Sequence, residues 1–188
     1  NDGGEILTGL SDEIWASTLD GAFSIYEDNP EYLENYGNLY NWYAVNDERG
    51  ICPENWHVPS DDEYKELEMY LGMSPEQANL AEAWRGTNQG LKIKDDIKWN
   101  GTNESGYSAL PAGFRTGTPN NNDDYYKIEE YSYFWTSTMG HNEGAWDRYV
   151  YDNQAEIGRG IAGFNTGWSV RCHETIEGCT DSFAINDT

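Results

Sequence analysis

Basic side chains are scarce in this chain. It has 11 Lys and Arg against 34 Asp and Glu, which gives a formal net charge of −23 at pH 7. Binding to nucleic acid requires a basic face that neutralises phosphates. The composition therefore excludes a nucleic-acid partner.

Large aliphatic side chains are also few. Leu, Ile, Val and Phe together make up about 16% of the chain, a share that with high net charge is typical of disorder. Aromatic residues reverse this expectation, because the chain has 8 Trp, 14 Tyr and 5 Phe. Each ring can bury about 150–250 Å², so we expect a compact core built largely from aromatic side chains.

Long apolar runs are absent. No stretch approaches the roughly 18 apolar residues of a membrane span, and the first ten residues, NDGGEILTGL, lack the basic and apolar regions of a signal peptide. The length of 188 residues suits one domain. We expect no membrane span and a piece of a processed or larger protein.

Cysteine occurs only three times, at positions 52, 172 and 179, and forms no metal-binding pattern. The separations suit one long-range disulfide with one cysteine left over, which favours an oxidising compartment. The alternative is three reduced cysteines in a cytosolic protein.

Two helices are predicted in the first half of the chain. Ser60 and Glu63 form a capping box for a helix that ends at Gly72. Ser74 caps a second helix, with Pro75 at its first position, that is predicted to run to about residue 84. After residue 86 turns dominate, and strands are predicted at 131–137, 146–151 and 167–172.

Five ordered blocks of sequence resemble the Fibrobacter succinogenes major paralogous domain. They are YGNLYNWYAV (36–45), CPENWHVPSD (52–61), SGYSALPAGFR (105–115), FWTST (134–138) and GWSVRC (167–172). The resemblance implies an α+β, C-type-lectin-like fold over residues 1–175, distantly related to formylglycine-generating enzymes. Two helices would occupy its first half, and short antiparallel strands with long loops its second half.

The resemblance also implies a compartment and a disulfide. Members are extracytoplasmic bacterial proteins, so we expect a secreted or cell-surface location and pairing of Cys52 with Cys172. Residues 176–188 are similar to the start of the Gly-Cys-Thr-Asp modules of secreted Bacteroidota proteins. We interpret this tail as a truncated acidic module whose Cys179 lacks its partner; the alternative is an ordinary frayed terminus.

No catalytic constellation stands out. The three histidines, His57, His141 and His173, form no recognisable triad order, and a structural hydrogen bond is the expected role of His57. The enzymatic relatives use active-site cysteines, whereas Cys52 and Cys172 are assigned here to a disulfide. We therefore predict a protein that is not an enzyme, although 34 carboxylates leave a glycosidase pair open.

The acidic segment 120–130 is a candidate structural calcium site. Calcium takes 6–8 oxygen ligands, which irregular acidic loops supply. A solvated acidic loop is the alternative, and the sugar-binding triplets of calcium-dependent lectins are absent. The candidate ligands are Asn122, Asp123, Asp124, Glu129 and Glu130.

Loops and strands between positions 134 and 168 are predicted to hold a ligand surface. Rings, amides and carboxylates together suit a sugar or a protein partner, and the alternative for each ring is a place in the core. The predicted function is a non-catalytic extracellular module that captures a glycan or another ligand; the alternative is an assembly domain of an adhesin or filament. Trp146 is the preferred anchor, whereas Arg115 and Arg171 are expected to support the scaffold. The candidate contacts are Asn142, Glu143, Trp146, Asp147, Arg148, Tyr149, Asn153 and Trp168.

Overall fold

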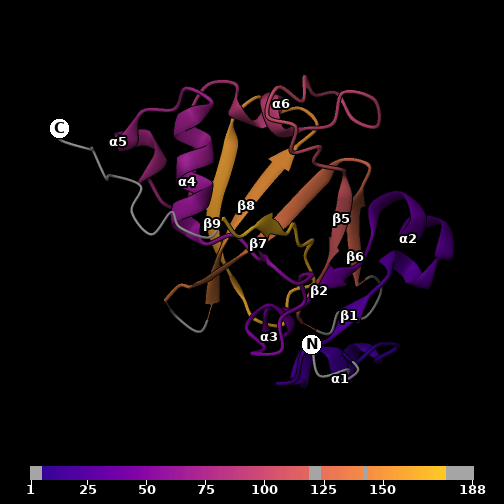
Figure 1. The fold of residues 1–188 in the computed structure, drawn as a ribbon. Helices are drawn as coiled ribbons and strands as arrows, with labels where there is room; N and C mark the ends of the chain where they lie inside the picture. Colours follow the sequence, from indigo (N-terminus) through magenta and orange to yellow (C-terminus); the bar gives the residue numbers. More distant parts are fainter. Residues whose placement is uncertain (1–5, 119–123, 142–143, 177–188) are drawn as a thin grey trace.

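A mixed six-stranded sheet organises the molecule (Figure 1). The computed structural model describes residues 6–118, 124–141 and 144–176. The strand order is β4-β9-β8-β7-β5-β6, and only the β5–β7 pair is parallel. The strands are β4 (Ala83–Arg85), β5 (Ala112–Arg115), β6 (Tyr125–Ile128), β7 (Tyr131–Met139), β8 (Gly144–Tyr151) and β9 (Ile157–Gly163).

Short helices and two small ribbons surround this sheet. In the view of Figure 1, α4 and α5 lie near β9, whereas α2 lies near β5 and β6. The ribbons are β1 (Phe23–Ser24) with β2 (Leu39–Tyr40), and β3 (Trp56–His57) with β10 (His173–Glu174). The helices are α1 (Asp12–Ser17), η1 (Tyr26–Asp28), α2 (Pro30–Tyr36), α3 (Trp42–Val45), α4 (Asp61–Tyr70), α5 (Pro75–Ala78) and α6 (Gln89–Ile93).

The first predicted helix is confirmed as α4, including its capping box. Ser60 accepts from the backbone of Glu63, and the Glu63 carboxylate accepts from the backbone of Ser60. The second prediction is wrong in length, because α5 ends at Ala78. Residues 83–85 instead pair with β9, so sheet pairing overrides the local helical pattern there.

Two of the three predicted strands are confirmed as β7 and β8. The third, 167–172, makes isolated bridges instead of a continuous ladder. Gly167 bridges Arg115, Trp168 bridges Tyr40, and Ser169 bridges Phe134. This segment therefore ties three parts of the fold together, which sequence periodicity does not reveal.

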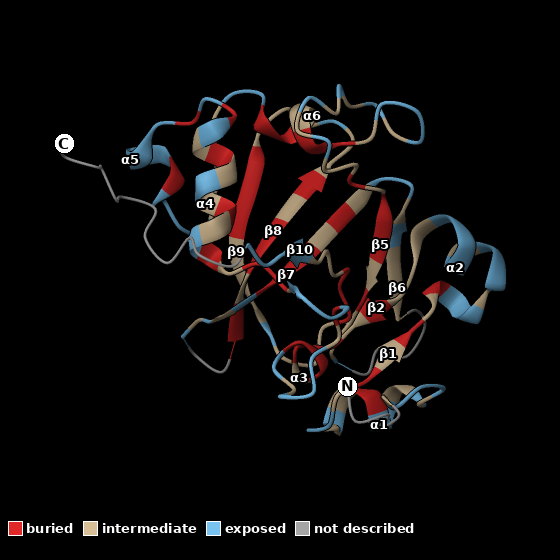
Figure 2. Ribbon diagram, in the orientation of Figure 1, coloured by how far each residue is buried: buried red, intermediate tan, exposed pale blue. Residues whose placement is uncertain are grey.

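Helix α4 packs on one face of the sheet through apolar and ionic contacts. Tyr64 joins Phe134, Val150 and Ile157 in a buried cluster. Beside it, Glu68 receives a bidentate pair of hydrogen bonds from Arg85, at 2.7 and 2.8 Å. Figure 2 shows that burial is concentrated on the central strands and on the inward face of α4.

Asp61 and Arg148 extend this buried ionic network. Arg148 donates to both Asp61 and Glu68, and Arg159 makes two further hydrogen bonds to Asp61. Burial alone would raise the pKa of the Asp61 carboxyl, but the hydrogen bonds from Arg159 and the charge of Arg148 hold that pKa below its usual value. The network orients α4 on the sheet with no unpaired carboxylate.

A second core lies under the opposite face, around Trp42, Trp135 and Trp168. The predicted disulfide is confirmed there: Cys52 and Cys172 are bonded at 2.04 Å, across 120 positions of sequence. The α+β class is confirmed as well. Across the described ranges, none of the helices combines the length and the apolar character required to cross a bilayer.

Candidate functional site

The structure divides the predicted ligand stretch between the two faces of the sheet. Directly paired residues of neighbouring strands point to the same face, and alternate residues point to opposite faces. Arg148 pairs opposite Arg159 and faces α4, whereas Tyr149 pairs opposite Gly158 and faces away from it. The candidate residues of β8 therefore cannot contact one ligand together.

Two of the predicted contacts are buried scaffold residues. Arg148 has no exposed surface, because Asp61 and Glu68 take its guanidinium. Trp168 is only 6% exposed; its ring stacks on Tyr133 and packs at a tilt against Trp135. The expectation that these two side chains lie on a ligand surface is wrong.

Trp146, the preferred anchor, is half-buried on the face that carries α4. The guanidinium carbon of Arg159 lies 3.7 Å from the centre of its ring. Trp146 thus covers the Arg159–Asp61 ion pair and is not an unoccupied stacking surface.

Of the remaining loop candidates, the structure describes Asn153. Asn153 is exposed in the turn after β8, where Lys94 donates to three backbone carbonyls. Asn142 and Glu143 lie outside the described residues.

The structure confirms the scaffold roles expected of two arginines. Arg115 pairs with Asp12 at 2.8 Å and donates to the carbonyl of Leu10. Arg171 donates to the carbonyl of Ser108. Both arginines join segments that are distant in sequence.

The face of the sheet that points away from α4 carries a row of half-buried rings. Trp84 packs edge-on against Tyr149 and Tyr151, with ring centres 4.8 and 4.7 Å apart. The rings of Tyr131 and Tyr151 stack at 3.7 Å. We call this set the aromatic face; its members are Trp84, Tyr131, Tyr133, Tyr149 and Tyr151.

Glycine on β9 makes room for these rings. A Cβ atom on Gly158 would lie 1.9 Å from the ring of Tyr149, so any other residue there would displace it. Among the residues of β9 that point to this face, Gly158 and Gly160 contribute backbone alone. The ring of Tyr149 can therefore lie over β9 and reach the ring of Trp84.

Asp147 is the acidic group of this face. It is 2% exposed and lies between Trp135 on β7 and Gly160 on β9. Burial raises the pKa of its carboxyl to about 7, against the charges of nearby arginines and a hydrogen bond from the Gly160 backbone. Its Oδ1 has no hydrogen-bond partner among the described residues.

The predicted calcium ligands do not form a single group in the described residues. Asp124 precedes β6, whereas Glu129 and Glu130 follow it, so the length of a strand separates them. Glu130 pairs with Lys127 at 2.9 Å. Asn122 and Asp123 lie outside the described residues, and a calcium site built from them stays a prediction.

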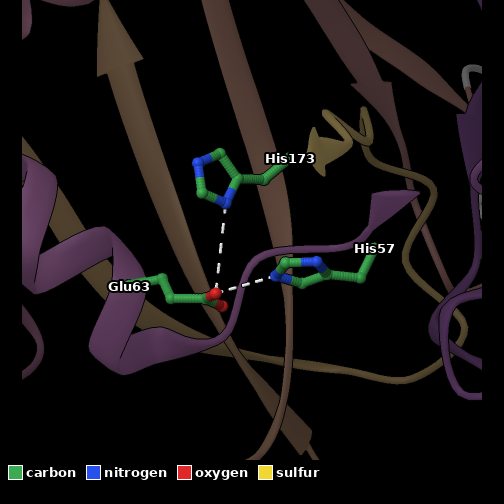
Figure 3. A group of neighbouring side chains, drawn as sticks. All are labelled: His57, Glu63 and His173. Atoms are coloured by element: carbon green, nitrogen blue, oxygen red, sulfur yellow. Dashed lines mark hydrogen bonds and ion pairs between the residues drawn. The ribbon is translucent and has the colours of Figure 1, made fainter. Parts of the chain in front are cut away.

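A histidine–glutamate cluster forms where the β3–β10 ribbon meets the start of α4 (Figure 3). His57 on β3 and His173 on β10 are direct cross-strand partners. Glu63 Oε1 lies 2.7 Å from His57 Nε2 and 4.0 Å from His173 Nδ1. The three donor atoms lie within 4.8 Å of one another.

A cavity of about 440 Å³ opens beside this cluster. Glu63 and His173 form part of its wall, together with Tyr107 and Arg171. Tyr107 donates or accepts a hydrogen bond at 2.7 Å with Tyr64, and burial raises the pKa of the Tyr107 hydroxyl well above its usual value. The cavity thus combines a ring, a neutral hydroxyl pair, one cation and the His–Glu donors.

Sequence reasoning gave His57 a structural hydrogen bond, which the structure confirms, but missed its meeting with His173. A signal was present: His57 lies five residues after Cys52, and His173 directly follows Cys172. The disulfide therefore brings the two histidines together.

Searches of curated proteins and of solved structures each found no match to the chain. A model of one protein family, the Fibrobacter succinogenes major domain, matches residues 2–173. That match covers the sheet, the β1–β2 ribbon and the disulfide, and it ends at His173 in β10. The chain belongs to the Fibrobacter succinogenes major domain family.

Proposed function

We propose that this domain is a non-catalytic extracellular binding module of a larger surface or secreted protein, and that it captures a glycan on the aromatic face. The observation that carries the proposal is the row of half-buried rings on the face of the sheet opposite α4. Flat ring surfaces pack against the C–H groups of a sugar, and fixed polar groups beside them select its hydroxyls.

The charges of the chain favour a neutral glycan. A net charge of −23 repels anionic polysaccharides unless cations bridge the two. Asp147 supplies a carboxyl oxygen without a partner under the ring row. A sugar hydroxyl that reached it would satisfy an acceptor that is otherwise buried and unpaired.

Two further features support an extracellular C-type-lectin-like module. The long-range disulfide is typical of oxidising compartments. The segment around Trp168 returns to pair with Tyr40 in the first quarter of the chain, so an early and a late segment of the domain meet beside the sheet. We infer from these features a C-type-lectin-like arrangement displayed at the cell surface.

A glycan array followed by calorimetry with the best neutral sugar tests the proposal. Trp84→Ala and Tyr149→Ala are expected to weaken binding by about 2 kcal/mol each if their rings are anchors. Tyr70→Ala is the matched control, because Tyr70 is 85% exposed on α4 and remote from the aromatic face. Melting temperatures of all three variants separate loss of binding from loss of fold.

If the domain is instead an assembly domain, the same experiments give a different result. No sugar binding, combined with self-association that the two aromatic-face variants abolish, would replace the glycan with a protein partner. Equal sugar binding by all three variants would remove the aromatic face from the proposal.

A further inference from the structure

The histidine–glutamate cluster has the donor set of a transition-metal site. We propose that His57, Glu63 and His173 bind one zinc-type ion, whose fourth coordination position faces the neighbouring cavity. Two imidazoles and one carboxylate are a ligand set that zinc uses when it keeps a position open. This site lies apart from the aromatic face and does not depend on the proposed function.

The separations suit a metal after small side-chain movements. Zinc with ligands at about 2.0–2.2 Å in tetrahedral geometry needs donor atoms roughly 3–3.5 Å apart. The distances from Glu63 Oε1 to the two histidines, 2.7 and 4.0 Å, lie on either side of that value, and the two histidine nitrogens, which lie within 4.8 Å of each other, must move closer together. The His173 side chain is 58% exposed, so its ring can turn toward the ion without disturbing the core.

Neighbouring groups already hold two of the ligands in place. Thr175 Oγ1 lies 2.8 Å from Nδ1 of His57, which leaves Nε2 directed at Glu63. Glu63 Oε2 accepts from the backbone and hydroxyl of Ser60, which leaves Oε1 directed at both histidines. Such outer hydrogen bonds orient metal ligands and set their tautomers.

The backbone under the three ligands is fixed from three directions. Cross-strand pairing sets His57 opposite His173, the disulfide joins the chain just before each of them, and the capping box fixes the first turn of α4. The site is therefore largely formed before an ion arrives, which reduces the entropic cost of binding.

The two histidine nitrogens favour a transition-metal ion over calcium. Calcium takes six to eight oxygen ligands, whereas imidazole suits zinc, copper and nickel. The cavity beside Glu63 and His173 leaves space for a water molecule or a donor atom of a bound molecule to complete the coordination.

Calorimetric titration with zinc chloride in excess magnesium tests the site. We expect one ion per chain, with affinity lowered at least about 10-fold in His57→Ala, His173→Ala and Glu63→Gln. Thr175→Ala is expected to lower it by about 10-fold, because it frees Nδ1 of His57. Gln at position 63 retains capping capacity, so the melting temperature of Glu63→Gln checks that α4 is intact.

His141 provides the matched control, since it is exposed and lies 3.8 Å from Glu82, away from the cluster. His141→Ala is expected to bind zinc like the parent protein. Cobalt substitution gives an independent readout, because its tetrahedral absorption bands should be present in the parent protein and absent in His173→Ala. Binding that magnesium displaces, or that the His57 and His173 variants retain, would overturn the proposal in favour of adventitious binding to surface carboxylates.

Discussion

At the scale of single residues, Asp147 shows how burial alone changes the chemistry of a carboxyl group. It lies on the same strand as Arg148, one position away, yet alternation of the strand directs the two side chains to opposite faces. Arg148 meets two carboxylates, whereas Asp147 meets rings and the glycine backbone of β9. The pKa of the Asp147 carboxyl rises to about 7 for that reason.

This raised pKa predicts a distinct dependence of stability on pH. The folded protein keeps the Asp147 proton up to about pH 7, whereas the unfolded chain releases it near 3.8. Stability from this group is therefore full below pH 4 and is lost as the pH rises through 7, by up to about 4 kcal/mol. Urea unfolding of the parent protein and of Asp147→Asn at pH 4, 5.5 and 7 checks this prediction. The neutral amide of the variant does not ionise, so the variant should not lose this stability as the pH rises.

The quantity to follow is the difference in free energy of unfolding between the parent protein and Asp147→Asn. Asp61 and Glu63, whose pKa values are lowered, lose their contribution in acid, but they do so equally in both proteins. A difference in free energy of unfolding that stays constant from pH 4 to 7 would contradict the assignment.

Trp146 is the second residue whose role depends on the face it occupies. Replacing it with alanine is expected to lower the free energy of unfolding by about 2 kcal/mol, because Arg159 loses both its ring contact and its cover from solvent. Glycan binding should persist, since the aromatic face lies on the other side of the sheet. Denaturant unfolding and calorimetry of Trp146→Ala distinguish a structural role from a binding role. Full stability with lost glycan binding would restore Trp146 as a ligand contact.

At the scale of elements, buried ion pairs fix the position of α4. Glu68→Ala is expected to cost about 3–5 kcal/mol, because it leaves the guanidinium groups of Arg85 and Arg148 without their shared carboxylate. Glu66→Ala on the exposed side of the same helix is the control, with an expected change within about 0.5 kcal/mol. Thermal and urea unfolding measure both, and equal effects would contradict a specific role for Glu68.

The same helix shows which elements a sequence can predict. Its capping box and apolar spacing are local signals, so α4 can be predicted from its own stretch of sequence. The end of α5 and the start of β4 are not local: Ala83–Arg85 forms a strand because β9 offers a free edge and Glu68 a partner for Arg85. The bridges of Trp168 likewise depend on three partners that no window of sequence contains.

The same difference between local and long-range signals applies to the candidate sites. Tyr149 is a predicted contact and lies on the aromatic face. The sequence predicts Trp84 at the end of a helix, and only strand register brings the two rings together. Alternation along β8 predicts two faces but not which one α4 covers. The meeting of His57 with His173 requires the disulfide and the β3–β10 pairing together.

At the scale of the whole molecule, the Cys52–Cys172 disulfide closes the part of the chain that carries the six-stranded sheet into one loop. Because it spans 120 positions, the chain-entropy model assigns it about 4–5 kcal/mol, a large contribution for a core with few aliphatic side chains. A Cys52→Ala, Cys172→Ala double variant is expected to lose that amount in denaturant unfolding. It should also bind zinc more weakly while still folded, because the bond holds the two strands that carry His57 and His173. Peptide mapping without reductant checks the pairing itself, and recovery of a Cys52–Cys179 peptide would contradict it.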